Sequence, residues 1–301
     1  MPSADDAPAG PGPGPGPSGP AVPGRSGHTS TLLADGRVLV FGGVDGETGA
    51  LTNRAFLFDP TLLRWEECAR GRPAGLAAAD AAASATTPAS SSGAAAAALR
   101  GAPPKARAHH AATRVGDGRV VVVGGCGAAS GGAWSMREVY SLDLGSLAWT
   151  ERTSRVTGFE GDDDVPAARQ AHAAVALDDS RVLVTGGWDD RPADKGGPVH
   201  FSDAAVLDCR TWTWRRVPTL AAGGAAAGRD RGLDQLDDSE AGPGAVAGHT
   251  LAVVDLAPDA ELDPRPYVVS FGGRGPGGET RGALWAVPVD DVLAWLDGRG
   301  A

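Results

Sequence analysis

A cycle of apolar and polar positions recurs along the chain, and its most complete copy runs from Arg169 to Trp214. An Arg-x-x-His start leads into an apolar run, a turn, and a second apolar run that stops at two glycines. After a polar connection comes a third apolar run that ends in Asp, and a Trp follows six positions later. Short apolar runs separated by turn residues predict β-strands, so each cycle predicts a four-stranded unit.

The spacing inside the cycle is nearly fixed. Three His residues lie fourteen positions before the first Gly of a pair: His28 and Gly42, His110 and Gly124, His172 and Gly186. Three Asp residues precede a Trp by six positions: Asp59 and Trp65, Asp143 and Trp149, Asp208 and Trp214. A fourth, looser copy starts at Val246, places His249 before Gly272 and Gly273, has Pro288 in place of the Asp, and reaches Trp295 one residue late.

Together, the Arg-x-x-His start, the Gly pair, the strand ending in Asp and the phased Trp resemble kelch repeats. The resemblance covers the chain from about Arg25 to Trp295. It implies a β-propeller of four-stranded blades around a channel, with the Arg-x-x-His strand innermost and the Trp strand outermost. We therefore expect an all-β, kelch-type propeller with four blades, at about 25–66, 107–151, 169–217 and 246–295.

Closure of the ring is the open structural question. Kelch propellers usually close with five to seven blades, whereas this chain shows four copies. The first copy begins with its innermost strand and the fourth ends with its outermost, so no strand is left over to join them. An open sheet edge favours association with another chain. A compact four-bladed ring, a fragment of a larger ring, and an arc completed by another chain all remain open.

The rest of the chain divides by composition. Residues 1–23 form a Pro/Gly-rich tail that we expect to be disordered, because the alternating Gly and Pro residues from Gly10 to Pro17 cannot form a strand ladder and have no side chains to bury. The propeller is expected over 24–297. Two low-complexity insertions, 70–104 and 221–244, are rich in Ala with Ser, Gly or acidic residues, and we predict no strands in them.

Charge and cysteine content limit the classes of partner and compartment. The formal net charge of −10 and the pI of about 5.0 argue against a nucleic-acid-binding surface, which needs a basic stripe. The chain contains no apolar run of the roughly eighteen residues that a membrane span needs, and its start does not resemble a secretory signal. Three widely separated cysteines suggest a reducing compartment, so we expect a cytoplasmic protein.

The four repeat histidines, His28, His110, His172 and His249, stand at the same place in every copy. A ring of imidazoles could hold a metal, but a repeat multiplies a packing solution just as readily, and we favour packing. The catalytic motifs G-x-S-x-G and H-E-x-x-H are absent. We expect no catalytic residues, no metal and no other cofactor.

Partner-binding residues are expected in two places. Arg25, Arg107 and Arg169 recur near the predicted channel mouth, where each guanidinium could bind a carboxylate or pair with a neighbouring blade or with backbone carbonyls. The loops that follow the Gly pairs should project on one face, and loops carry function more often than strands do. The candidates there are Asp45, Trp188, Asp189, Asp190 and Arg274.

These observations favour a non-catalytic interaction module that binds a protein partner through the loop face of the propeller. A small-molecule-binding or metal-assisted enzyme that uses the channel mouth is the alternative. A third option is an incomplete arc that self-associates through its open blade edges. The sequence does not identify the partner or the ligand.

Overall fold

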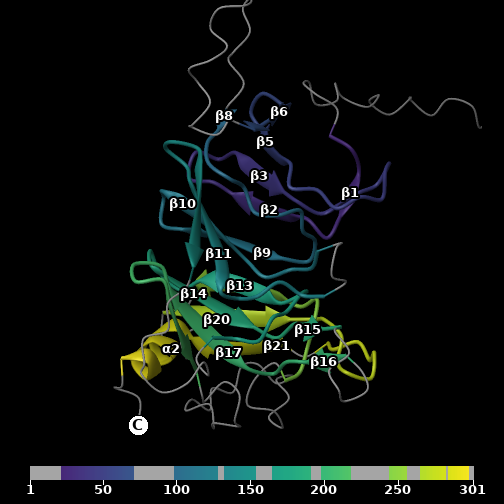
Figure 1. The fold of residues 1–301 in the computed structure, drawn as a ribbon. Coiled ribbons are helices and arrows are strands. Elements are labelled where there is room, and N and C mark those ends of the chain that lie inside the picture. The colour runs from purple at the N-terminus through teal and green to yellow at the C-terminus, as the bar shows by residue number, and fades with distance from the viewer. Residues whose placement is uncertain are drawn as a thin grey trace, which may run out of the picture.

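The computed structural model describes residues 22–70, 98–127, 132–153, 165–190, 198–217, 244–255, 265–282 and 284–297. Four antiparallel sheets follow one another around a common axis as the blades of a β-propeller (Figure 1). The all-β propeller fold predicted from the repeats is therefore confirmed. Blade one lies at the top of Figure 1 and blade four at the bottom, with blades two and three between them.

Blades one to three each contain four strands, and the spatial order of the strands follows the chain. Blade one consists of β2 (Thr29–Leu32), β3 (Val38–Phe41), β5 (Ala55–Asp59) and β6 (Arg64–Glu67). Blade two consists of β9 (Ala111–Val115), β10 (Arg119–Val123), β11 (Glu138–Asp143) and β12 (Ala148–Thr153). Blade three consists of β13 (Ala173–Ala176), β14 (Arg181–Thr185), β17 (Ala204–Asp208) and β18 (Thr213–Arg216).

The innermost strand of each blade directly follows the Arg-x-x-His position, or Val-x-x-His in blade four. β2 contacts β9, β9 contacts β13, and β13 contacts β19 (Thr250–Asp255). The phased tryptophans of blades one to three lie in the outermost strands β6, β12 and β18. The order of strands that the kelch resemblance implied is therefore present in these three blades.

Apolar side chains fill the spaces between neighbouring blades. In β10 the side chains alternate, because successive residues of a strand point to opposite faces. Val120 and Val122 pack in the core between blades one and two, and Val121 and Val123 pack in the core between blades two and three. All four are at most 2% exposed, which explains why the strand is continuously apolar from Val120 to Val123.

Blade four departs from the prediction. It has three strands, β19, β20 (Pro266–Phe271) and β21 (Leu284–Pro288), and the segment expected to form the Trp-bearing strand is the helix α2 (Val289–Leu296). Pro288 is the N-cap of this helix, and Asp290 and Asp291 in the first turn complement the helix dipole. Val289, Val292 and Leu296 supply the buried face, in the core shared by blades three and four.

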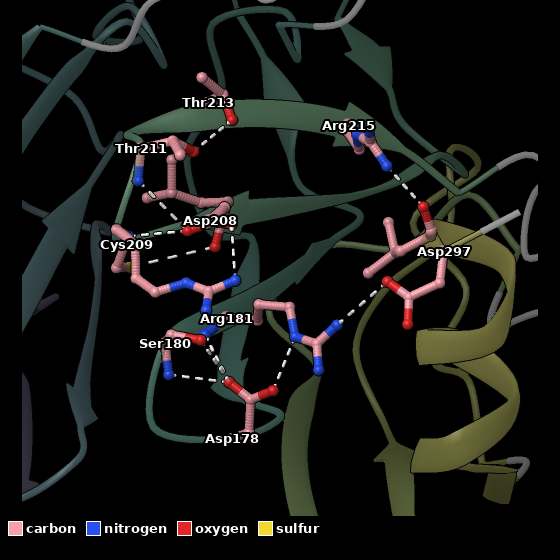
Figure 2. A network of polar contacts seen from close by, with 12 residues as sticks. Asp178, Ser180, Arg181, Asp208, Cys209, Thr211, Thr213, Arg215 and Asp297 are labelled. Carbon is pink, nitrogen blue, oxygen red and sulfur yellow. Dashed lines mark hydrogen bonds and ion pairs between the residues drawn. The ribbon is translucent and has the colours of Figure 1, made fainter.

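Polar contacts hold α2 against blade three, near the turn between β13 and β14. Figure 2 shows Arg181 between two carboxylates, Asp178 of its own hairpin at 2.6 Å and Asp297 after the helix at 3.7 Å. Arg215 of β18 donates to the carbonyl oxygen of Leu296. The helix thus covers the outer edge of blades three and four, where a fourth strand was expected.

Short strand pairs occur where none was predicted. The ends of the first insertion form a parallel pair, β7 (Ala69–Arg70) with β8 (Ala98–Leu99), so the prediction of an insertion without strands is wrong at these ends. The loops after two of the Gly pairs also form short strands. β4 (Val44–Asp45) pairs with β1 (Arg25–Ser26) at the start of blade one, and β15 (Trp188–Asp189) pairs with β16 (Val199–His200). Most of the predicted tail, residues 71–97 of the first insertion and nearly all of the second lie outside the described residues.

Candidate partner-binding face

The Gly pairs turn the chain in the same way in all four blades. Both glycines of each pair have positive φ, from 60° to 93°, a conformation that favours glycine over residues with a Cβ. The residue after each pair then forms a short antiparallel bridge with the residue two positions before the repeat His: Val44 with Ser26, Cys126 with Ala108, Trp188 with Gln170, and Arg274 with Ala247. Four loops therefore leave the propeller on one side, where β1, β15 and β16 lie in Figure 1.

We call this side the loop face, made of the described residues 44–54, 126–127, 132–137, 188–190, 198–203 and 274–282. The opposite side, where β2 turns into β3 and β9 into β10, is the hairpin face. All the loop residues predicted to bind a partner lie on the loop face. They fall into two groups, one at blade one and one at blades three and four.

The repeat arginines lie beneath the loop face and make the same backbone contacts in three blades. Nη1 donates to the carbonyl of the first Gly of the same blade, at 3.2 Å for Arg25 and 2.9 Å for both Arg107 and Arg169. Nε donates to the carbonyl two residues earlier, at 3.4, 3.1 and 3.1 Å. Each guanidinium thus ties the entry of a blade to its Gly pair.

Aromatic rings and burial complete the surroundings of these arginines. The Arg25 guanidinium lies 4.6 Å from the Phe56 ring centroid, Arg107 lies 5.2 Å from Tyr140, and Arg169 lies 4.3 Å from Phe201. Arg107 is 0% and Arg169 is 1% exposed, whereas Arg25 is only half-buried. In this conformation the guanidiniums of Arg107 and Arg169 are closed to a ligand on the loop face, and Arg25, although half-buried as a residue, also has a buried Nη2.

Arg107 and Arg169 differ in their electrostatic compensation. Arg169 forms a bidentate pair with Asp203, with Nη1 2.7 Å from Oδ1 and Nη2 2.9 Å from Oδ2. Arg107 forms no hydrogen bond to a carboxylate within the described residues, and its buried Nη2 has no hydrogen-bond acceptor there. Burial lowers the pKa of Arg107 to about 10.

Asp45 is buried and shapes its own loop. Its Oδ1 accepts hydrogen bonds from the backbone N–H of Glu47 and of Thr48, both at 3.0 Å, and from the Thr48 hydroxyl at 3.2 Å. These donors, the Thr48 N–H above all, hold the pKa of Asp45 below its ordinary value. One carboxylate oxygen of Asp45 is therefore occupied within the turn.

The second group combines an aromatic ring with both signs of charge. The Trp188 ring stacks on His200, with centroids 6.1 Å apart and planes 18° apart. Asp189 is half-buried, and Asp190 and Arg274 are exposed. The backbone bonds of Gly187 to Val246 at 2.7 Å and of Ala247 to Arg274 at 2.9 Å join the two loops. Trp188, Asp190 and Arg274 therefore lie on adjoining loops.

Three of the four repeat histidines are buried between blades. The His110 Nε2 lies 2.9 Å from the Thr29 hydroxyl, and the His249 Nε2 lies 2.8 Å from the Thr185 hydroxyl. Burial lowers the pKa of His110 to about 3 and of His249 to about 4, and it holds the pKa of His172 well below 6.5. Within the described ranges, no three His, Cys, Asp or Glu side chains are placed to hold a metal ion together.

The sequence patterns did not predict a cavity between blades one and two at the hairpin face. It has a volume of about 250 Å³, and its apolar lining includes Leu33, Leu57, Leu144 and Leu147, with Cys68 beside them. The signal in the sequence is a leucine within three positions of Asp35, Asp59 and Asp143, three turn residues of these two blades. The cavity lies away from the predicted channel mouth and from the loop face.

None of the described helices is long and apolar enough to cross a membrane. Among solved structures, the chain resembles the structure of YjhT with a TM-score of 0.51 at 14% identity, over 90% of this chain and 68% of that one. It is also 32% identical over 120 residues to the dynein alpha chain of the flagellar outer arm of Chlamydomonas reinhardtii, a match over 38% of this chain and 2% of the dynein chain. The KLHDC2/KLHL20/DRC7 Kelch-repeats domain matches residues 14–231, and the chain belongs to this kelch family.

Proposed function

We propose that the chain is a non-catalytic interaction module whose loop face binds a protein partner. Kelch propellers are typically protein-interaction modules, and this chain is a member of that family. The observation that carries the proposal is the group on the adjoining loops of blades three and four, Trp188, Asp190 and Arg274. Aromatic and Arg side chains contribute more binding energy at protein interfaces than other residue types do.

The chemistry of this group defines the kind of partner. Asp189 and Asp190 would attract a basic group, Arg274 would bind a carboxylate, and the Trp188 ring would cover an apolar or cationic side chain. Arg25, at blade one, is half-buried and adds a second positive charge near the loop face. We therefore infer a partner segment of mixed charge, rather than a uniformly acidic one.

The similarity to dynein supports a role within an assembly. The matched stretch is 2% of a chain named for the flagellar outer arm, so the activity of the whole dynein chain does not carry over. We infer that this chain works as one interaction module among several components of an assembly. Its three cysteines, Cys68, Cys126 and Cys209, are free, which supports a reducing compartment such as the cytoplasm.

A charge-swap experiment tests the proposal. The double variant Asp190→Lys with Arg274→Glu reverses the two exposed charges beside Trp188 and keeps the net charge of the chain. The matched control, Asp117→Lys with Arg64→Glu, makes the same exchange at two exposed positions of the hairpin face. Both variants and the wild type are immobilised, and bound proteins are quantified by mass spectrometry after incubation with native lysate.

The expected result is a set of proteins that the wild type and the hairpin-face control enrich equally and that the loop-face variant loses. Equal retention by all three forms would place the binding surface elsewhere. Absence of any enriched protein would contradict the interaction role itself.

One observation favours small-molecule binding as the second candidate function, namely the leucine-lined cavity between blades one and two. A volume of about 250 Å³ suits a small apolar ligand. The variant Leu147→Trp would fill this cavity. If the candidate is right, an apolar reporter dye that binds the wild type should lose affinity for the variant, and binding that survives the substitution would exclude this cavity.

A further inference from the structure

The joints between neighbouring blades repeat the same backbone hydrogen bonds. The second Gly of a pair donates to the first residue of the next repeat: Gly43 to Arg107 at 2.8 Å, Gly125 to Arg169 at 3.0 Å, and Gly187 to Val246 at 2.7 Å. Two residues further on, each repeat donates back to the blade before it: His109 to Gly27 at 2.8 Å, Ala171 to His109 at 2.8 Å, and Gly248 to Ala171 at 2.7 Å. Each side of a joint therefore contributes one backbone donor and one backbone acceptor, in a fixed register.

Side chains repeat the pattern at the same joints. The residue before each Gly pair is buried to 1% exposure in blades one to three, namely Phe41, Val123 and Thr185. The repeat His of the next blade packs against this place, as in the edge contact of Phe41 with His110 at 5.4 Å between ring centroids. A Cβ on Gly42, Gly124 or Gly186 would approach the Cε1 atom of that His to 2.8, 2.5 or 2.7 Å. The first Gly of each pair is therefore required by the blade that follows.

Blade four carries the same parts, but among the described residues no neighbouring blade covers them. Phe271, at the position of Phe41, is 53% exposed. A Cβ on Gly272 would meet no atom within 4 Å, although Gly272 has the same left-handed conformation as Gly42, with φ of 79° against 69°. Among the described residues, Gly273 also lacks the inter-blade backbone bond that Gly43, Gly125 and Gly187 make.

Blade one carries the residues of the other half of such a joint, and these residues are exposed. His28 is exposed, whereas His110, His172 and His249 are 5, 6 and 7% exposed. Leu32 points to the same side of its strand, since it lies four residues after His28, and it is 63% exposed. Within the described chain, no inter-blade bond joins Gly27 to Gly248. The two blades lie at opposite ends of the molecule in Figure 1.

We propose that these two ends dock on each other between two copies of this chain. Phe271, Gly272 and Gly273 of one copy would pack on Arg25, His28 and Leu32 of the second copy, and so repeat the joint that already links blades one and two. The chain itself carries both halves of the joint in the register that three internal joints use, and this is why a second copy is the occupant.

The symmetry of the contact limits the assembly. A head-to-tail contact between identical chains either closes into a ring or continues as a filament. Two copies with four blades each would give eight blades, which lies inside the range of roughly four to eight blades that propellers adopt. We therefore expect a closed pair with two identical joints, which buries both copies of Phe271 and of Leu32.

The test is the mass of the full chain in solution, measured by light scattering and sedimentation over a wide range of protein concentration. The wild type should reach twice the 30.2 kDa of one chain. The variant Gly272→Asn should remain at the mass of one chain. Its side chain has open space in the single copy, but in the joint it would stand where a Cβ on Gly42 meets the Arg107 carbonyl oxygen and the His110 ring at 2.8 Å.

The matched control is Gly36→Asn, in the exposed hairpin of blade one. Gly36 has φ of 83°, and a Cβ there also meets nothing within 4 Å, so the backbone strain is the same as at Gly272. Asn is among the residues that best tolerate this conformation. This control should associate like the wild type. If it became monomeric too, the loss in Gly272→Asn would reflect strain and the argument from the joint would fail.

A second variant approaches the joint from the other end. His28→Asp leaves a solvated carboxylate in the single copy and places a charge against Phe271 in the joint, so it should also hold the chain at the mass of one copy. A wild type that stays monomeric at every concentration overturns the proposal, as does association that survives both variants. Thermal unfolding of each variant verifies folding, and no partner is present, so failure here leaves the proposed function untouched.

Discussion

Arg107 and Arg169 occupy equivalent places in neighbouring blades, and replacing each with Met gives a matched test of the pair between Arg169 and Asp203. Both arginines donate from Nη1 to the first Gly of their blade at 2.9 Å and from Nε to a carbonyl at 3.1 Å. Both guanidiniums also lie against an aromatic ring. These losses are similar in the two variants, so the difference between them isolates the carboxylate of Asp203.

The size of that difference follows from burial. Breaking a fully buried ion pair costs about 3–5 kcal/mol, because one charge remains without a partner. The Asp203 side chain is 22% exposed, so water can take over part of its solvation once Arg169 is gone. Arg107, in contrast, has a buried Nη2 without an acceptor among the described residues, and its removal relieves a desolvated cation. We expect Arg169→Met to cost about 2–3 kcal/mol more free energy of unfolding than Arg107→Met.

Urea unfolding followed by tryptophan fluorescence measures both variants, and low protein concentration keeps association out of the comparison. A double-mutant cycle sharpens the result: Asp203→Asn should destabilise the wild type and change the Arg169→Met background little. Equal costs for the two Met variants, or a coupling between Arg169 and Asp203 below about 0.5 kcal/mol, would refute the reasoning.

Three further predictions follow from burial. Phe41→Ala should lower the free energy of unfolding by about 3–5 kcal/mol, because it leaves a cavity between blades one and two, whereas Phe271→Ala should lower it by less than about 0.5 kcal/mol. Equal losses for the two variants in urea unfolding would contradict the exposure of Phe271 at the end of blade four. The neutral, buried His249 has a folded pKa of about 4, below the ordinary 6.5, so the unfolded chain binds more protons and stability should fall as pH drops from 6.5 to 4. His249→Gln should reduce this pH dependence of the urea midpoint, and the rest should come from His110 and His172, whose pKa values are also lowered by burial. A thiol reagent should label half-buried Cys126 first in the folded protein, because Cys68 and Cys209 are buried and burial raises their pKa to about 12. Fast labelling of Cys68 or Cys209 would contradict this prediction.

The strands of the first three blades could be predicted from the sequence because local requirements determine them. A strand that packs between two neighbouring blades must be apolar on both faces, as from Val120 to Val123 in β10. A left-handed turn favours glycine, as at Gly124 and Gly125. The position of the loop residues followed from the same repeat. These features depend on residues close together in the chain, so the sequence is sufficient to place them.

The surroundings of the repeat arginines could not be predicted in the same way. From the sequence, each arginine could equally bind backbone carbonyls or an acidic ligand, because the Arg-x-x-His motif is compatible with both. The choice depends on the carbonyl of a glycine seventeen residues later and on the approach of the next blade, which buries Arg107 and Arg169. The motif does not record that long-range packing, so it cannot tell a structural guanidinium from an accessible one.

The fourth blade was mispredicted because the repeat spacing concealed a helical pattern. Trp295 lies seven positions after Pro288, close to the six that mark an outer strand. The buried residues Val289, Val292 and Leu296 are spaced by three and four positions, however, which is the period of a helix rather than of a strand. Pro288 cannot donate to a strand ladder but suits the start of a helix, so the local signals agree with each other and not with the repeat.

The two open ends could not be predicted from the sequence either, because their residues match those of the internal joints. Terminal repeats of a solenoid usually present a polar outer face, which keeps them soluble and single. This chain instead keeps an exposed Phe271 beside an unobstructed Gly272 at one end, and an exposed His28 and Leu32 at the other. Because the proposed joint repeats the internal step from blade to blade, both copies would present their loop faces on the same side. A partner that contacts both loop faces would then bind the pair with higher apparent affinity than it binds Gly272→Asn, whereas a partner that fits one loop face would bind both forms alike.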